Sequence, residues 1–237
     1  MILICRLLIA MLCLSSAGLG QGSGSTQTGY VAVTPVVGFG EGLTIQGRIE
    51  HQADGASFHG TVWSGGGVIR TALIVSSDRR SGIDTGIALV NPNDFAADIT
   101  LTLRRDDGQI VATRIITLER RRQISRFIGE IFSGQGELVL TGFLSISSTL
   151  PLGIAGLLFQ GQEFSFVPNT GPVGAPALLL PHFATGGGWS TNVVIANAVL
   201  AAQIVRVDFF SPNGTIIKTL GSVTVPAAGV AVVSAGN

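Results

Sequence analysis

Residues 82–118 read GIDTGIALVNPNDFAADITLTLRRDDGQIVATRIITL, and residues 188–225 read GWSTNVVIANAVLAAQIVRVDFFSPNGTIIKTLGSVTV. The two stretches align at a constant offset, because 188−82, 191−85, 197−91 and 214−108 all equal 106. At this offset Gly82 aligns with Gly188, Thr85 with Thr191, Asn91 with Asn197 and Gly108 with Gly214. One residue inserted in the second stretch then realigns the ends of the two stretches. We call the stretches the first and the second repeat. A repeat of this length favours a duplicated β unit over a solenoid, whose periods are shorter.

The composition favours an all-β protein. A chain of 237 residues with 46% hydrophobic residues can bury one large core or two smaller ones. The 33 Gly, the 9 Pro and the low charged share of 12% are typical of short strands joined by many turns. We therefore predict two tandem antiparallel β-sandwich units with Ig-like or Greek-key-like topology, at residues 30–133 and 134–237; the alternative is one sandwich of double length.

The N-terminus predicts export. Arg6 precedes the apolar run Leu7–Leu14, and small residues fill positions 15–20, so residues 1–20 are expected to form a signal peptide. The run is too short to span a membrane comfortably, and we expect no transmembrane segment in the mature chain. A lipid anchor at Cys13 stays open, although no small residue directly precedes it. The mature protein is thus expected to be secreted or extracytoplasmic.

Residues 21–29 (QGSGSTQTG) predict a flexible linker before the first unit. Both cysteines, Cys5 and Cys13, lie in the expected leader. The mature chain should therefore hold neither a disulfide nor a Cys metal site.

Three hairpins can be predicted from turn residues. Asp54-Gly55 predicts a two-residue turn between strands at Leu43–His51 and Ser57–Trp63, which pairs Glu50 with His59. In each repeat a three-residue turn is expected to end in a Gly at positive φ, Gly108 or Gly214.

The register that follows from these turns predicts a shared apolar face in the first repeat and an Asp208–Lys218 pair in the second. That apolar face comprises Ile99, Leu101, Leu103, Val111 and Ile115. Further strands are expected at Tyr30–Val37, Val68–Val75, Leu138–Ser147, Leu152–Phe159, Glu163–Val167, Ala177–Leu180, Ser190–Asn197 and Gly229–Ser234, with a short helix at Ser125–Phe132.

The stretch FATGGGWST at residues 183–191, with Asn197 at the end of the next strand and Pro212-Asn213-Gly214 beyond, carries a resemblance. It is similar to uncharacterised secreted bacterial β-sandwich repeat modules, in which Gly-Gly-Gly-Trp-Ser-Thr begins a strand, Asn-Pro ends it and Asp/Asn-Gly closes a hairpin. The first repeat has Ile83 in place of the Trp, and the second has Ala198 in place of the Pro. The resemblance implies an exported β-sandwich and no known activity.

Catalytic and metal-binding patterns are absent from the sequence. His51 and His59 fall on opposite faces of the predicted hairpin, so they should not share a metal. The chain has no Gly-x-Ser-x-Gly motif to mark a nucleophile. Asp106-Asp107-Gly108 lacks the spaced ligands and terminal Glu of a calcium loop. We therefore predict no enzyme activity, no cofactor and no metal.

Two surfaces are candidate ligand sites. Trp63 shares a predicted sheet face with Arg48, Glu50 and His59, and an aromatic ring among polar groups can stack on a sugar. The alternative is a Trp covered by a neighbouring domain. The second candidate is an arginine cluster that can hold a polyanion, at Arg120, Arg121, Arg122 and Arg126, with Arg104, Arg105 and Arg114 as further members. The alternative is a solvated loop balanced by Glu119 and Asp106.

The function predicted from sequence is a non-catalytic extracytoplasmic structural or adhesion protein, and the alternative is a carbohydrate- or polyanion-binding module. The expected partners are a surface glycan or another protein. Nucleic acid is not expected, because the formal net charge is zero. The oligomeric state stays open.

Overall fold

The computed structural model describes residues 30–32, 46–53, 56–63, 67–135, 139–161, 163–169, 178 and 180–236; within the first two strands, the side chains of residues 50–60, 62 and 63 are outside this description. The predicted signal peptide, linker and residues 33–37 of the expected first strand lie outside the described residues.

The fold is all-β and antiparallel, as the composition predicts. Helical structure is limited in the described chain to single turns: η1 (Arg79–Ser81), α2 (Ile128–Ile131) and η2 (Ser133–Gln135). The strands are β1 (Gln46–Ala53), β2 (Ala56–Trp63), β3 (Val68–Asp78), β4 (Ile83–Asn91), β5 (Ala97–Arg105), β6 (Ile110–Leu118), β7 (Arg122–Phe127), β8 (Val139–Gln160), β9 (Glu163–Val167), β10 (Asn192–Ala196), β11 (Gln203–Phe210), β12 (Ile216–Val225) and β13 (Val230–Ser234).

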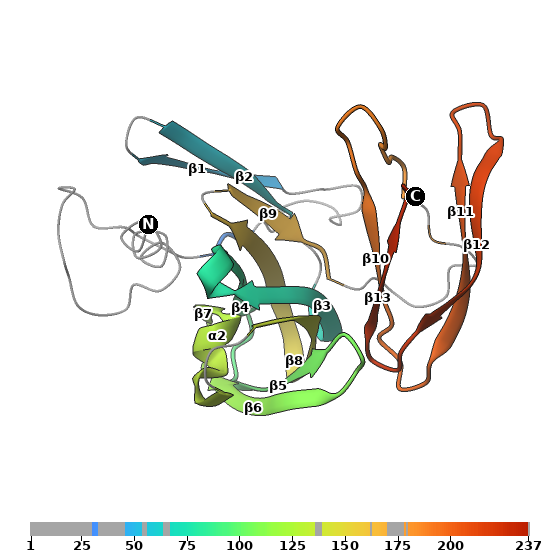
Figure 1. Ribbon diagram of the computed structural model, residues 1–237. Coiled ribbons are helices and arrows are strands. Elements are labelled where there is room, and N and C mark those ends of the chain that lie inside the picture. The colour runs from blue at the N-terminus through green and yellow to red at the C-terminus, as the bar shows by residue number, and fades with distance from the viewer. Residues whose placement is uncertain are drawn as a thin grey trace, which may run out of the picture.

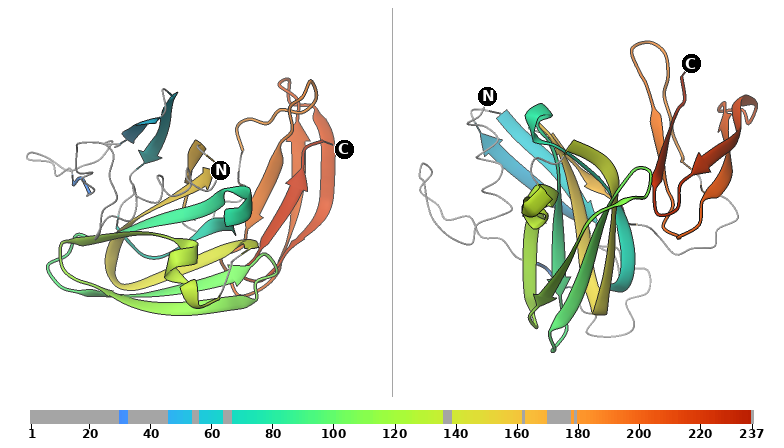
Figure 2. Two further views of the ribbon diagram at one scale, coloured as in Figure 1. Left: turned by 60° about the vertical axis from the view of Figure 1, so that its left-hand side comes forward. Right: turned by 60° about the horizontal axis from the view of Figure 1, so that its bottom comes forward.

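One curved seven-stranded sheet, in the order β6-β5-β8-β3-β4-β7 with β9 beside β8, holds the first repeat (Figures 1 and 2). The long strand β8 joins its two parts. Residues 142–148 of β8 pair with β5, whereas residues 153–160 pair with β4. Because β8 also pairs with β3 along most of its first half, it is the central strand of the whole sheet.

The core lies inside the curve of this sheet. Alternate residues of β4, β5 and β8 point to it, and Leu89, Ile99, Leu101 and Leu144 are each 0% exposed. The alternation of buried and exposed positions along β5 is the pattern expected of a strand with one face on a core. Helical turn α2 adds Ile128, and Phe132 follows directly; both are fully buried.

The second repeat and the strand β13 that follows it form two separate two-stranded sheets, β10–β13 and β11–β12, which Figure 1 shows as two pairs of strands side by side. Each pair has a counterpart in the large sheet: β10–β13 corresponds to β4–β7, and β11–β12 corresponds to β5–β6. The two parts of the chain touch where Val230 packs with Ala72 and Phe143, and the Val230 amide donates to the Asp106 carbonyl at 2.8 Å.

Both predicted three-residue turns are confirmed. The amides of Arg105 and Ser211 donate to the carbonyls of Gln109 and Thr215 at 2.9 and 2.8 Å. Gly108 and Gly214 each have φ of 86°. The β1–β2 register is also confirmed, since Glu50 lies opposite His59 and His51 opposite Phe58.

The register beyond the turns is wrong by one residue in both repeats, and a second irregularity between Val205 and Val207 shifts the rest of β11 by one residue more. A β-bulge follows each turn, between Leu103 and Arg104 and between Phe209 and Phe210. The extra residue shifts the partner strand by one and reverses its faces. Ile99 therefore pairs with Ile116, and Ile115 is 74% exposed rather than buried.

The same shift places Asp208 opposite Thr219, while Lys218 lies opposite Phe209. The Lys218 ammonium donates instead to the carbonyls of Ser234 and Gly236. The predicted Asp208–Lys218 pair is therefore wrong.

Three predicted elements also differ. Ser125 lies in β7, and the expected helix is reduced to α2, whose first turn is capped by Glu130 accepting from the Phe127 amide at 3.0 Å. The strands expected at Leu138–Ser147 and Leu152–Phe159 form the single strand β8. Residues 178 and 180 are not in a strand. Because β8 pairs with β3, β4 and β5, which all precede residue 134, the large sheet crosses the predicted unit boundary.

Candidate functional site

The arginine turn, which we define as Arg120, Arg121 and Arg122, lies between β6 and β7 and is exposed to solvent. Arg121 has a φ of 57°, and its guanidinium contacts the Asp94 carboxylate at 2.8 Å. This contact raises the pKa of Arg121 through hydrogen bonding and charge. Within the part of the chain that the structure describes, Arg120 and Arg122 make no ion pair.

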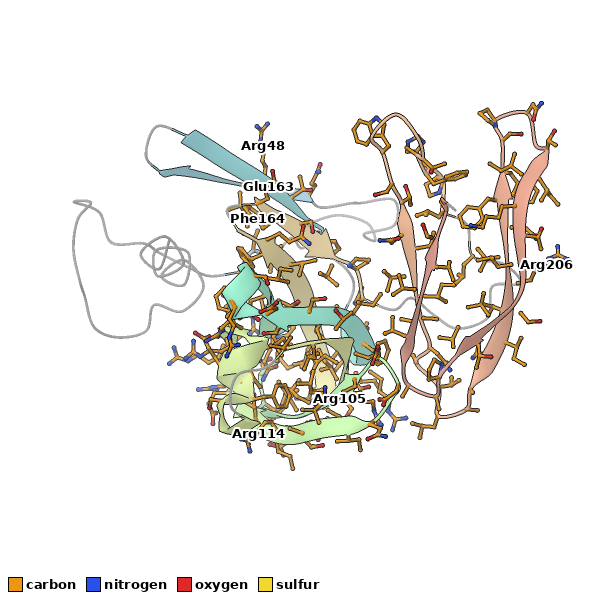
Figure 3. All side chains as sticks on the ribbon, in the orientation of Figure 1. Arg48, Arg105, Arg114, Glu163, Phe164 and Arg206 are labelled. Atoms are coloured by element: carbon orange, nitrogen blue, oxygen red, sulfur yellow. The ribbon has the colours of Figure 1, made fainter. Side chains whose placement is uncertain are left out.

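The other arginines do not join this turn. Arg126 is half-buried and donates to the carbonyl of its neighbour Ser125 at 3.0 Å. Arg104 donates to the Gly108 carbonyl at 2.9 Å, at the opposite end of the β5–β6 hairpin. A nine-residue strand separates the two ends by about 27 Å. Figure 3 shows Arg105 and Arg114 on this hairpin, so the predicted seven-arginine surface is not one patch.

The hairpin face predicted to bind sugar keeps its register. Gln46 lies opposite Trp63, Arg48 opposite Thr61 and Glu50 opposite His59, so the backbone places Arg48, Glu50, His59 and Trp63 on one face. Arg48 is exposed and extends outward from the hairpin in Figure 3. The side chains of Glu50, His59 and Trp63 are outside the described residues.

A buried asparagine at the end of β4 is a feature that residue-type patterns did not single out. Asn91 is 0% exposed, and its Nδ2 donates to the carbonyls of Phe95, Leu118 and Glu119 at 2.8, 2.8 and 3.2 Å. Its Oδ1 accepts from the Asn93 amide at 3.0 Å. One side chain thus ties the β4–β5 connection to the end of β6.

Asn197 makes the same bonds in the second repeat. Its Nδ2 donates to the carbonyls of Ala201, Val225 and Pro226 at 2.8, 3.4 and 2.9 Å, and its Oδ1 accepts from the Val199 amide at 3.1 Å. Every partner corresponds to that of Asn91 at an offset of 106 or 107 residues. The repeat offset in the sequence already matched these two asparagines.

A threonine at the start of the first strand of each repeat also recurs. The Thr85 hydroxyl donates to the Ser76 carbonyl at 2.8 Å and accepts from the Ser76 amide at 2.8 Å. Thr191 does the same with Ala184, at 2.8 and 3.0 Å. Each hydroxyl therefore replaces a pair of backbone hydrogen bonds between the strand and the segment before it.

A buried carboxylate of the first repeat, Asp84, forms an ion pair with Arg79, whose side chain is 42% exposed. Asp84 is 8% exposed; it accepts from Arg79 Nε at 2.9 Å and from the Thr85 amide at 3.0 Å. Burial raises the pKa of Asp84, and the guanidinium of Arg79 opposes this shift. The guanidinium lies across Gly129, where a Cβ would be 3.1 Å from Nη2. At an offset of 106 the second repeat has Ser190 in place of Asp84, so the pair is not repeated.

These polar groups can hold neighbouring strands together. The described ranges contain no group of three or more His, Cys, Asp or Glu side chains that could hold a metal ion. No described helix is long and apolar enough to cross a membrane.

Comparisons with known proteins found no matching family model, no similar curated protein and no similar solved structure.

Proposed function

We propose that the protein is a non-catalytic, exported structural protein of the adhesion type, built from two copies of one β-sandwich unit. The observation that carries this proposal is the recurrence of the Asn91 hydrogen bonds at Asn197, partner for partner. The threonine bonds and both three-residue turns recur as well. The polar groups that recur hold the backbone of each unit in place, because each of them bonds to backbone atoms.

The groups that do not recur support the same proposal. Asp84 is the buried carboxylate of the first repeat, and its charge is matched by Arg79. General acid–base catalysis needs a group within reach of a substrate proton, whereas Asp84 is held against the sheet by Arg79 and the Thr85 amide. A stabilising role for this pair is the simpler account.

The experiment that tests the proposal follows the native protein in its own cells. We expect the mature chain in the extracytoplasmic or surface fraction, with its N-terminus near Gln21 by mass spectrometry. Deletion of the gene should weaken adhesion or the cell envelope, and a wild-type copy and an Asp84→Asn copy should restore it equally. A cytoplasmic product that retains residues 1–20, or a phenotype that depends on Asp84 in a correctly folded variant, would contradict the proposal.

A second candidate function rests on the arginine turn. Arg120 and Arg122 are exposed and make no ion pair with the described residues, so their charges are available to an acidic glycan or a phosphate-bearing surface. The triple variant Arg120→Ala, Arg121→Ala, Arg122→Ala should abolish salt-dependent binding to a sulfated or uronic-acid polysaccharide. Arg105→Ala, at the far end of the hairpin, is the matched control. Equal binding by both variants would exclude this function.

A further inference from the structure

The loop that follows each three-residue hairpin has the same backbone shape in both repeats. Glu119 and the arginine turn correspond to residues 226–229, since 226−119 and 229−122 both equal 107. Arg121 and its counterpart Ala228 have φ of 57° and 47°, and they are the only residues other than Gly with positive φ in the described chain. The two repeats therefore carry different side chains on one backbone frame.

In the second repeat this loop is a contact surface. The tip of the β5–β6 hairpin lies against it, and the Val230 amide directly after the loop donates to the Asp106 carbonyl at 2.8 Å. This contact depends on Gly229, because a Cβ there would lie 2.5 Å from the Asp106 carbonyl oxygen. Arg122 takes the place of Gly229 in the first repeat. The hairpin tip of a second copy therefore does not fit the arginine turn in the same way.

An exposed aromatic ring lies beside the arginine turn. Phe95, in the connection between β4 and β5, is 76% exposed, and its carbonyl accepts from the same Asn91 Nδ2 group as the Glu119 carbonyl. The preceding residue, Asp94, accepts from Arg121 through Nε at 3.1 Å and Nη2 at 2.8 Å. Two sets of bonds thus tie the connection that carries Phe95 to the arginine turn. A ring and three guanidinium groups are held together at one end of the sheet.

The second repeat has the same frame but lacks the ring and the charges. At the corresponding positions it has Leu200, Ala201, Ala227, Ala228 and Gly229. Asn197 nevertheless donates to the Ala201 and Pro226 carbonyls, as Asn91 does to those of Phe95 and Glu119. The frame therefore forms without the aromatic and charged side chains, so they are available for a role outside it.

We propose that Phe95 and the arginine turn form one binding site for an anionic polysaccharide, in which a sugar ring stacks on Phe95 and the arginines bind carboxylate or sulfate groups. Such a site rests on the second candidate function given above, to which it adds Phe95 and the sugar ring. Arg120 and Arg122 are exposed and make no ion pair with the described residues. A guanidinium can donate two parallel hydrogen bonds to one anionic group.

The charges around Phe95 favour a sugar over a lipid surface. The arginine turn carries three positive charges, and Asp94 and Glu119 beside it carry two negative charges. Attachment to an anionic membrane uses about four to eight basic residues or a second anchor, and two carboxylates oppose it. A sugar, by contrast, presents hydroxyl groups that can donate to these carboxylates while its ring covers the aromatic side chain.

The test measures the Kd of the full chain by calorimetry at low salt for three probes: polygalacturonate, dextran sulfate and polyphosphate. The first two are anionic polysaccharides, whereas polyphosphate has the charge without a sugar ring. We expect the wild type to bind at least one of the polysaccharides. Phe95→Ala and Phe95→Leu should raise its Kd about tenfold and leave polyphosphate binding unchanged, and Phe95→Tyr should bind as the wild type does.

Phe210→Ala, which removes a ring that is 50% exposed on the second repeat, is the matched control and should bind as the wild type does. Because Phe95 is an exposed side chain, thermal melts of its variants should match that of the wild type.

Polysaccharide binding that is equal in Phe95→Ala and the wild type, but lost in the triple arginine variant, would refute the stacking and leave the second candidate function standing. A wild type that binds neither polysaccharide would overturn both. Binding of phosphatidylglycerol vesicles and of neither polysaccharide would likewise overturn the proposal and assign the surface to a lipid partner.

Discussion

Replacing Asn91 by Ala tests whether one buried side chain holds the end of the β4 strand. The bond from Asn91 Nδ2 to the buried Leu118 carbonyl is 2.8 Å long, and its loss leaves that carbonyl unsatisfied, which costs about 1–3 kcal/mol. The bonds to Phe95, Glu119 and Asn93 are nearer the surface and contribute about 0.5–1 kcal/mol each. We expect a loss of about 3 kcal/mol in the free energy of unfolding, or a fall in Tm of about 10 °C.

The second repeat supplies the internal comparison. Asn197 is 5% exposed, and its bond to the Val225 carbonyl is longer, at 3.4 Å. Asn197→Ala should therefore cost less than Asn91→Ala, about 2 kcal/mol. Asn192, exposed at the start of β10, is the matched control, and Asn192→Ala should change stability by less than about 0.5 kcal/mol. Urea denaturation and thermal melts followed by circular dichroism measure the stability of all three variants. If Asn91→Ala is as stable as Asn192→Ala, the hydrogen bonds of Asn91 do not hold the end of the strand.

Further variants test the turns and the charges. Gly214→Val should cost about 1–2 kcal/mol from positive φ alone, and Gly108→Val should cost more, because its Cβ would also collide with the Ala227 carbonyl; equal melts of the two variants would contradict this. Asp208→Lys should lower Tm less than Gly214→Val does, because it removes the bonds that Asp208 accepts from Arg206 and Thr219 and places no like charge opposite Lys218; a larger fall than that of Gly214→Val would contradict this. Burial raises the folded-state pKa of Asp84, so the folded protein binds that proton more tightly than the unfolded chain. Wild-type stability should therefore fall relative to Asp84→Asn as pH rises from 3.8 to the folded-state pKa and then stay level, as urea titrations from acidic to neutral pH would show; an unchanged difference would exclude a titrating Asp84.

The turns could be predicted from sequence because their chemistry is local. Gly108 and Gly214 adopt a φ that few other residues accept, so the sequence carries a direct mark of the hairpin. No residue type in the sequence indicates the β-bulge that follows each turn. It depends on how two backbones align, and one extra residue was enough to expose Ile115 and to separate Asp208 from Lys218.

The role of β8 could not be predicted for a different reason. Its sequence reads as two strands broken near Pro151, and nothing local indicates that the two halves pair with different partners. Such pairing is long-range and depends on the complete fold. The same limit applies to Asn91, which the Asn-Pro pattern marks only as the end of a strand, whereas its role depends on carbonyls 27 and 28 residues away.

The arginine turn was recognised from three consecutive charges, but its extent was overestimated. Arg105 lies only 15 residues before Arg120 in the sequence, yet the β5–β6 hairpin places Arg104 and Arg105 at its other end. Charge density along a chain does not equal charge density on a surface when a strand runs between the charges.

The two repeats make the same polar hydrogen bonds but bury their apolar strand residues to different extents. Asn91 and Asn197 make the same bonds, and Thr85 and Thr191 likewise, although Leu101 is fully buried and its counterpart Val207 is not. The polar bonds of the second repeat therefore form although its apolar strand residues are less buried than those of the first. The difference in burial accompanies a difference in pairing: β5 lies between β6 and β8, whereas among the described residues β11 pairs only with β12. Substitutions at Leu101 should therefore lower stability more than the same substitutions at Val207, whereas Asn91 and Asn197 hold corresponding connections in both repeats.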